Sequence, residues 1–199
     1  MKDNLTSIII LLDQSGSMLS LRNDVIKGFN NFLNEQKKSS GESVLTLCVF
    51  STDNIIVYDW EKLSNIHYLD GDYSPIGGTA LLDAMGTTIE KVGRRLYETS
   101  EKDRPSKIIF VVITDGKDNS SAIFNLDKVK NMVRHQQSKY NWNFIFFGAN
   151  IDAIIEGNLL GITNNINYDP TPFGIQKLYD DMFKKINGYD LFLKNEINF

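Results

Sequence analysis

Three short stretches of this 199-residue chain carry small oxygen-bearing side chains next to glycine. They are Asp13-Gln14-Ser15-Gly16-Ser17, Gly77-Gly78-Thr79 and Thr114-Asp115-Gly116. None contains histidine or cysteine, and carboxylate and hydroxyl oxygens are the ligands that hard cations prefer. A small ligand number that leaves room for water favours Mg²⁺ as the cofactor, with Mn²⁺ as a close alternative and Ca²⁺ as a third.

The spacing within the first stretch has a mechanical meaning. In a turn that leaves a strand, residues two apart can point the same way, so Asp13, Ser15 and Ser17 can converge on one ion. Gly16 between them lets the backbone bend. Because hydroxyl ligands are neutral, two carboxylates, Asp13 and Asp115, about balance a divalent charge. An open coordination position would then favour an anionic oxygen from outside.

The elements that must position these stretches alternate between strands and helices. We expect strands over residues 7–12, 43–50, 54–60, 107–114 and 143–147, and at most a short edge strand over 165–168. We expect helices from 19 towards 41, from 79 to 96, and over 126–140, 152–159 and 173–197. This order predicts an α/β fold: a three-layer, doubly wound, Rossmann-like sheet, mostly parallel with one antiparallel edge strand and helices on both faces. Ligands bind such sheets at the carboxyl ends of the strands, where Asp13 and Asp115 are expected.

Composition narrows the classes of function. With 21 Lys+Arg against 25 Asp+Glu, the net charge is -4 and no basic run is long enough for nucleic acid. The single cysteine, Cys48, lies in an apolar run and is expected to be buried, and one cysteine cannot form an intramolecular disulfide. No apolar run approaches the roughly 20 residues that span a bilayer. We therefore expect no membrane anchor and a cytoplasmic location.

The three stretches together resemble a known family. Residues 8–18, Ile-Ile-Ile-Leu-Leu-Asp-Gln-Ser-Gly-Ser-Met, look like the first metal-site motif of von Willebrand factor A domains, D-x-S-x-S after a hydrophobic strand. Gly77-Gly78-Thr79 resembles the second motif and residues 111–116 the third, in matching order. The resemblance is strongest over residues 7–148. We expect one domain over 1–199, with C-terminal helices in 149–199 completing the fold.

This resemblance implies a metal-ion-dependent adhesion site and a protein-binding module rather than an enzyme. By resemblance, Ser15, Ser17 and Thr79 contribute hydroxyl ligands, and Asp13 and Asp115 act directly or through bound water. The remaining position is typically filled by a Glu or Asp carboxylate of a partner protein. In the family, metal coordination is also coupled to movement of the last helix. Residue spacing leaves open whether Thr79 contacts the ion directly or through water.

Residues near the three stretches have more than one interpretation. Tyr73 and Ile76 flank the second stretch and are the candidates for the rim of the partner-binding surface, with ordinary loop packing as the alternative interpretation. Asp83, Asp118 and Asn119 are also close in sequence and could contact the metal, although favourable placement of acids in a first helical turn and loop solvation explain them well. His67 and His135 have no spacing that suits zinc and are expected at the surface.

Two alternative functions stay open. A Mg²⁺-dependent phosphatase or hydrolase also holds acidic side chains at strand ends. The haloacid-dehalogenase type, however, needs an aspartate two residues after the nucleophile, where this chain has Ser15. The chain could instead be a subunit of an ATPase- or kinase-associated complex. One pointer is the apolar stripe expected on the last helix: Leu178, Met182, Phe183, Ile186, Leu191 and Phe192.

Overall fold

A six-stranded sheet forms the centre of the computed structural model, which describes residues 1–188. The strands lie in the order β3-β2-β1-β4-β5-β6. All neighbours are parallel except β2 and β3, which form an antiparallel hairpin. The prediction of a mostly parallel sheet with one antiparallel edge strand is confirmed. The strands are β1 (Lys2–Asp13), β2 (Glu42–Phe50), β3 (Asn54–Lys62), β4 (Pro105–Thr114), β5 (Asn143–Gly148) and β6 (Asn165–Asn167).

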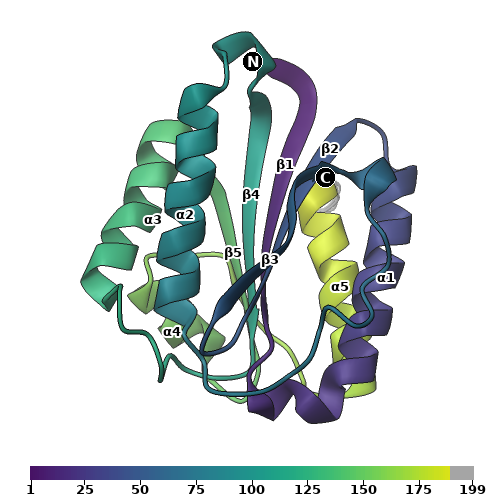
Figure 1. The fold of residues 1–199 in the computed structure, drawn as a ribbon, viewed down its shortest axis with the longest axis vertical. Coiled ribbons are helices and arrows are strands. Elements are labelled where there is room, and N and C mark those ends of the chain that lie inside the picture. The colour runs from purple at the N-terminus through teal and green to yellow at the C-terminus, as the bar shows by residue number, and fades with distance from the viewer. Residues whose placement is uncertain (189–199) are drawn as a thin grey trace, which may run out of the picture.

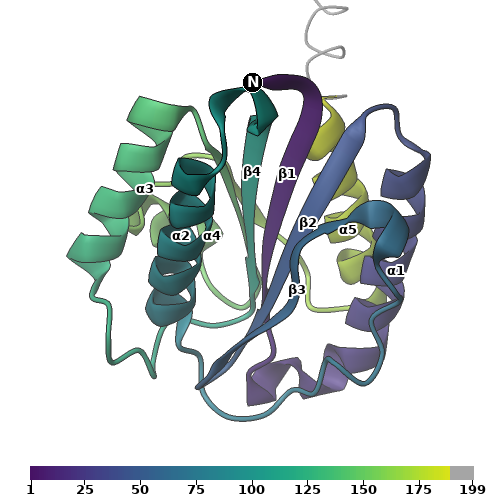
Figure 2. The same ribbon diagram turned by 45° about the horizontal axis from the view of Figure 1, so that its top comes forward.

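Helices cover both faces of this sheet (Figure 1), and the turned view in Figure 2 separates the two layers. α1 and α5 pack on one face, and α2, α3 and α4 on the other. Because the chain moves outward from β1 to β3 and then returns to β4 on the other side of β1, the strand order reverses between β1 and β4. Ligands bind doubly wound sheets at such a reversal. The helices are α1 (Arg22–Lys38), α2 (Leu81–Glu98), α3 (Leu126–Tyr140), α4 (Ala153–Leu159) and α5 (Pro172–Asn187).

The central strand β1 is buried on both faces. Ile8, Ile10 and Leu12 pack under α1 and α5, whereas Ile9 and Leu11 pack under α2 and α3. All five side chains are fully buried, and each contributes on the order of 2 kcal/mol of transfer free energy. The aliphatic run therefore places Asp13, the last residue of β1, in the middle of the carboxyl edge, at the lower end of the sheet in Figure 1.

The ends of the chain differ from the sequence expectation. β1 begins at Lys2, five residues before the expected start, because its first residues pair with neighbouring strands although residues 2–4 are exposed. α5 ends at Asn187, since Gly188 adopts a left-handed conformation with φ 77° and caps the helix. The expected continuous helix to Ile197 is therefore wrong at Gly188. Leu191 and Phe192 of the expected stripe lie outside the described residues.

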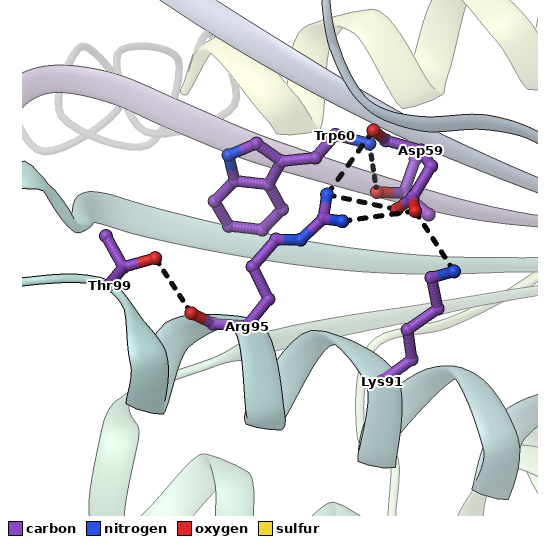
Figure 3. A network of polar contacts seen from close by, with 6 residues as sticks. Asp59, Trp60, Lys91, Arg95 and Thr99 are labelled. Atoms are coloured by element: carbon purple, nitrogen blue, oxygen red, sulfur yellow. Dashed lines mark hydrogen bonds and ion pairs between the residues drawn. The ribbon is translucent and has the colours of Figure 1, made fainter.

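The edge strand β3 is shielded by a bulge and by charged side chains. Its register with β2 shifts near Trp60, which has a φ of 59° and whose N–H donates to Thr46 Oγ1 at 3.1 Å. Figure 3 shows Asp59 bound by two cations of α2, Lys91 at 3.0 Å and Arg95 at 3.1 Å, while the Arg95 guanidinium lies 5.6 Å from the Trp60 ring centroid. A twisted and charged edge resists pairing with other chains.

Several smaller expectations can be compared with the structure. Cys48 is buried in β2, and burial raises the pKa of its thiol to about 11, so the thiol is an inert packing group. His67 and His135 are exposed, as predicted. Among residues 1–188, no helix combines the length and the apolar character needed to cross a membrane.

Two glycines of α2 give a matched test of the packing around this helix. A Cβ on Gly86 would lie 2.3 Å from the Phe124 ring, whereas a Cβ on Gly93 would meet its nearest atom at 3.9 Å. We expect Gly86→Ala to lower the free energy of unfolding by about 1–3 kcal/mol through overpacking. Gly93→Ala should raise it by about 0.5–1 kcal/mol. Urea denaturation measures both, and a stable Gly86→Ala protein would contradict the packing described here.

Candidate metal centre

The carboxylate of Asp13 is fully buried, and both of its oxygens are held. Oδ1 accepts from the backbone N–H of Ser15 at 2.6 Å, and Oδ2 accepts from Thr114 Oγ1 at 2.6 Å. Thr114 can reach Asp13 because β4 pairs beside β1. The backbone carbonyl of Asp13 accepts from the Tyr73 hydroxyl at 2.7 Å. The orientation of this carboxylate is thus set by three separate segments of the chain.

A line of oxygens joins the first loop to the third. Ser15 Oγ lies 3.1 Å from Ser17 Oγ, and Ser17 Oγ donates to Asp115 Oδ1 at 2.6 Å. Ser15 and Asp115 are 2% and 5% exposed, whereas Ser17 is exposed, so the group opens to solvent on the Ser17 side. The tertiary structure therefore brings the first and third predicted stretches into contact.

The second stretch needs both of its glycines. Gly77 has a φ of 81°, and its carbonyl accepts from the Gly16 N–H at 3.0 Å. A Cβ on Gly78 would lie 2.1 Å from Ser120 Oγ. This tight turn leaves Thr79 only 3% exposed, with its Oγ1 3.7 Å from where a Cβ of Gly116 would be. The Thr79 hydroxyl thus lies against the third loop, beside Asp115.

The loop after Asp115 fixes the start of α2. Asn119 Oδ1 accepts from the Thr79 N–H at 2.8 Å, and Asp118 Oδ1 accepts from the Leu82 N–H at 3.1 Å. Asp83 of α2 in turn holds this loop, because its carboxylate accepts hydrogen bonds from the backbone N–H groups of residues 122–124 at 2.7–2.9 Å. Asp83, Asp118 and Asn119 therefore use their side-chain oxygens to accept hydrogen bonds from the backbone of a neighbouring segment.

The buried carboxylates of Asp13 and Asp115 lie close together without a positive charge beside them among the described residues. Burial raises the pKa of Asp13, and the nearby charge of Asp115 adds to the rise, while the hydrogen bonds from Thr114 and Ser15 oppose it. Among residues 1–188, no lysine or arginine forms an ion pair with Asp13 or Asp115. Two buried carboxylates without a counter-charge are costly unless a cation lies beside them.

Tyr168, in the segment after β6, provides a second sign of a missing partner. Its hydroxyl is buried and has no hydrogen-bond partner within the described residues. Burial raises its pKa well above the usual value, and the charges of Asp115 and Asp13 add to the rise. Within residues 1–188 no cluster of three or more His, Cys, Asp or Glu side chains is found, so the donors here are two carboxylates and three hydroxyls. This all-oxygen set, with a spare hydroxyl beside it, fits a hydrated hard cation.

One predicted site residue is misplaced. Tyr73 is fully buried, and its hydroxyl is used by the Asp13 carbonyl, so the expectation that Tyr73 lies at the partner-binding rim is wrong. The period of apolar and polar residues is weak in this loop, and an aromatic ring there can turn inward to cover the core. Ile76, by contrast, is 72% exposed and lies beside the first loop, since its N–H donates to the Gln14 carbonyl at 2.8 Å.

Sequence reasoning missed the roles of Thr114 and Tyr168. Thr114 is adjacent to Asp115 in the third stretch, but only the pairing of β4 with β1 shows that it binds Asp13. Tyr168 follows a strand of three residues and carries no motif. The only feature of the sequence that could have pointed to Tyr168 is its position directly after an edge strand.

The chain was compared with known proteins at three levels. A family model described as von Willebrand factor type A domain matches residues 7–180. Among curated proteins, none matches. A solved von Willebrand factor type A structure from Catenulispora acidiphila has a TM-score of 0.63 at 17% identity, over 94% of this chain and 43% of that chain.

Two further structures widen the comparison. Proximal thread matrix protein 1 from the mussel byssus, solved with a zinc-occupied MIDAS motif, has a TM-score of 0.63 at 14% identity, over 92% of this chain and 46% of that chain. The ArnB paralog VWA2 from Sulfolobus acidocaldarius has a TM-score of 0.56 at 18% identity, over 88% of this chain and 44% of that chain. This chain thus spans less than half the length of these three chains. At such identities the likeness establishes the fold.

The orphan hydroxyl of Tyr168 leads to a first prediction at this site. In metal-free protein, we expect Tyr168→Phe to raise the free energy of unfolding by about 1 kcal/mol, because a buried unpaired hydroxyl is removed. The gain should shrink when Mg²⁺ is added. Tyr179→Phe is the matched control, since its hydroxyl is also buried and unpaired, but burial alone accounts for its raised pKa. Thermal melts with and without Mg²⁺ measure this, and a gain that ignores Mg²⁺ in both variants would contradict the prediction.

Asp83 leads to a prediction about pH. Burial raises the pKa of Asp83, but the three backbone N–H groups lower it by more, so the folded-state pKa lies below its ordinary value. The stabilisation is therefore fully present above the ordinary carboxyl pKa and is lost as the pH falls through the lower folded value. We expect Asp83→Ala to cost about 1–3 kcal/mol at neutral pH, and less in acid. Urea denaturation across pH, with the exposed Asp53→Ala as control, would show a constant cost if the idea is wrong.

Proposed function

The chain belongs to the von Willebrand factor type A domain family, and we propose that it is a metal-ion-dependent protein-binding module. Domains of this family are commonly interaction modules that bind protein partners. In the proposal, one Mg²⁺ at the carboxyl edge of the sheet is held by Asp13, Ser15, Ser17, Thr79 and Asp115. The ion then accepts a Glu or Asp carboxylate from a partner protein.

The observation that carries this proposal is the uncompensated pair of buried carboxylates, Asp13 and Asp115, joined by the hydroxyls of Ser15 and Ser17. A hydroxyl that donates to a carboxylate can instead turn its lone pairs to a cation without any movement of the backbone. A divalent ion would also supply the charge that this buried group lacks. The arrangement therefore supports a preformed site that needs little reorganisation.

The residues have distinct parts in this proposal. The two carboxylates provide negative charge, and the hydroxyls of Ser15, Ser17 and Thr79 provide neutral oxygens. Because the hydroxyl ligands are neutral and the two carboxylates do no more than balance the ion's charge, the open coordination position near exposed Ser17 can still accept an additional anionic oxygen. When bound, the metal supplies a positive centre for that oxygen. The hydrogen bonds from the Ser15 N–H to Asp13 and from the Thr79 N–H to Asn119 hold the proposed metal ligands in place.

The identity of the ion is part of the proposal. The oxygen donors favour Mg²⁺, with Mn²⁺ and Ca²⁺ as the next candidates. A relative, proximal thread matrix protein 1, has been solved with zinc in its MIDAS motif, so Zn²⁺ belongs among the ions tested. Direct ligation by Thr79, or contact through water, is likewise a question for a structure with the ion bound.

The wider context is proposed on the same basis. We expect a single domain over residues 1–199 that works in the cytoplasm, in contact with a protein partner and with neither nucleic acid nor membrane. The three solved structures named above are more than twice as long as the part they share with this chain. An ATPase- or kinase-associated complex is a context in which such a module would act.

Metal binding can be tested directly by calorimetry. We expect Mg²⁺ and Mn²⁺, titrated into chelator-treated protein, to bind one to one. Asp13→Ala should lose this binding by at least tenfold, or about 1.4 kcal/mol, because half of the compensating charge is removed. The control is Asp72→Ala, which removes an exposed carboxylate of the loop before the second stretch.

Circular dichroism should show that Asp13→Ala keeps its fold, since the variant removes a buried charge. Unchanged Mg²⁺ affinity in a folded Asp13→Ala protein would overturn the proposed function. Equal loss in Asp72→Ala would show that the effect is general electrostatics and would also count against it.

A further inference from the structure

Each of the three loops that form the candidate metal centre also carries one large aliphatic side chain in solvent. Leu19 follows Ser17 and is 62% exposed, Ile76 precedes Gly77 and is 72% exposed, and Ile123 follows Asn119 and is 73% exposed. Aliphatic groups exposed to this degree gain nothing from the core. Their presence on all three oxygen-bearing loops calls for an explanation in terms of what covers them.

These side chains stand on firmly held backbone. The Ile76 N–H donates to the Gln14 carbonyl at 2.8 Å, and the Ile123 N–H donates to Asp83 Oδ1 at 2.9 Å. Leu19 lies in a short 3-10 helix between two buried neighbours, Met18 and Leu21. Because the backbone is fixed, these side chains cannot easily fold back into the core. Leu19, Ile76 and Ile123, one on each of the three loops, are called here the apolar rim.

Further apolar groups lie on the same edge of the sheet. Ile154 and Ile155 in the first turn of α4 are 54% and 56% exposed, and Phe173 in the first turn of α5 is 77% exposed. Both helices begin where the chain leaves the carboxyl ends of β5 and β6. The far ends of α2 and α3 expose Tyr97 and Tyr140 instead, whose hydroxyls tolerate water. Aliphatic exposure is thus concentrated on the edge that carries the metal centre.

The charges on this edge are acidic. Asp53 in the β2–β3 turn and Asp70 and Asp72 in the loop before the second stretch are all exposed. The nearby Lys117 is paired with Glu156 at 2.6 Å. Arg22 donates to the backbone carbonyls of Asp70 and Tyr73 in the same loop. A segment with many carboxylates would therefore be repelled by the exposed aspartates of this edge.

We propose that this edge binds a protein segment in which one acidic residue is flanked on both sides by large apolar residues. This inference rests on the proposed function, and it adds the chemistry of the residues beside the carboxylate. The carboxylate meets the ion, and the flanking side chains cover Leu19, Ile76 and Ile123. A single anionic group within an apolar sequence satisfies both the positive centre and the aliphatic rim, whereas an acidic cluster satisfies only the first.

The probe is a displayed library of random 12-residue peptides, selected on the native chain in Mg²⁺ and eluted with a chelator. We expect the enriched peptides to carry one Asp or Glu with large apolar residues within two positions on each side. Enrichment of acidic peptides without apolar neighbours would overturn this inference and leave the proposed function standing. A failure to enrich any chelator-released peptide would overturn both.

Variants of the rim give an independent readout with one synthetic peptide from the selection. We expect Ile76→Ser and Ile123→Ser each to weaken its binding by about tenfold. Tyr97→Ser is the matched control, because Tyr97 is 85% exposed at the far end of α2 and should change binding less than twofold.

Mg²⁺ calorimetry on the same variants separates the rim from the ion. We expect the Mg²⁺ affinity of Ile76→Ser and Ile123→Ser to equal that of the native chain. Unchanged peptide binding in both variants would overturn the inference. A parallel loss of Mg²⁺ and peptide binding would assign the effect to the metal loops and would also overturn it.

Discussion

The structure depends on one constraint: a carboxylate is buried at the end of the central strand. Asp13 ends β1, which is paired on both sides and covered on both faces, so the side chain cannot turn to water. The fold holds it with one backbone N–H from Ser15 and one hydroxyl from Thr114, and neither donor is a cation. Neutral donors fix the geometry but leave the negative charge available. Under the proposed function, this available negative charge is what would attract a divalent ion.

The loops around Asp13 support one another through backbone contacts. Gly77 receives the Gly16 N–H, Asn119 receives the Thr79 N–H, and Asp83 receives the N–H groups of residues 122–124. Because other residues do the holding, the hydroxyls of Ser15, Ser17 and Thr79 are spared for a ligand. The acidic and amide side chains close to the site in sequence thus hold the loop backbone. The smaller hydroxyl side chains are the ones proposed to bind the ion.

The same rigidity bears on partner recognition. Leu19, Ile76 and Ile123 are exposed on loops that the hydrogen-bond lattice holds, so their apolar surface is present before a partner arrives. A preformed surface reduces the ordering that binding requires. In the proposed function, the metal centre alone would accept any accessible carboxylate, and the exposed aliphatic side chains would distinguish one carboxylate from another.

The sequence alone determined the fold class, the order of strands and helices, and the three loops that carry the candidate ligands. These features follow from local patterns: the aliphatic run before Asp13, the spacing of apolar residues in the helices, and glycine beside hydroxyl residues. Only the tertiary structure decided that Thr114 binds Asp13, that Tyr73 turns inward, and that the Tyr168 hydroxyl is buried without a partner among the described residues. The helix end at Gly188 was also missed, because a helical apolar period continues across it. The physical reason is common to most of these cases. Periodicity reports on neighbours along the chain, whereas Asp13 contacts Tyr73 and Thr114, which lie 60 and 101 positions away, and whether they meet depends on how the strands pair.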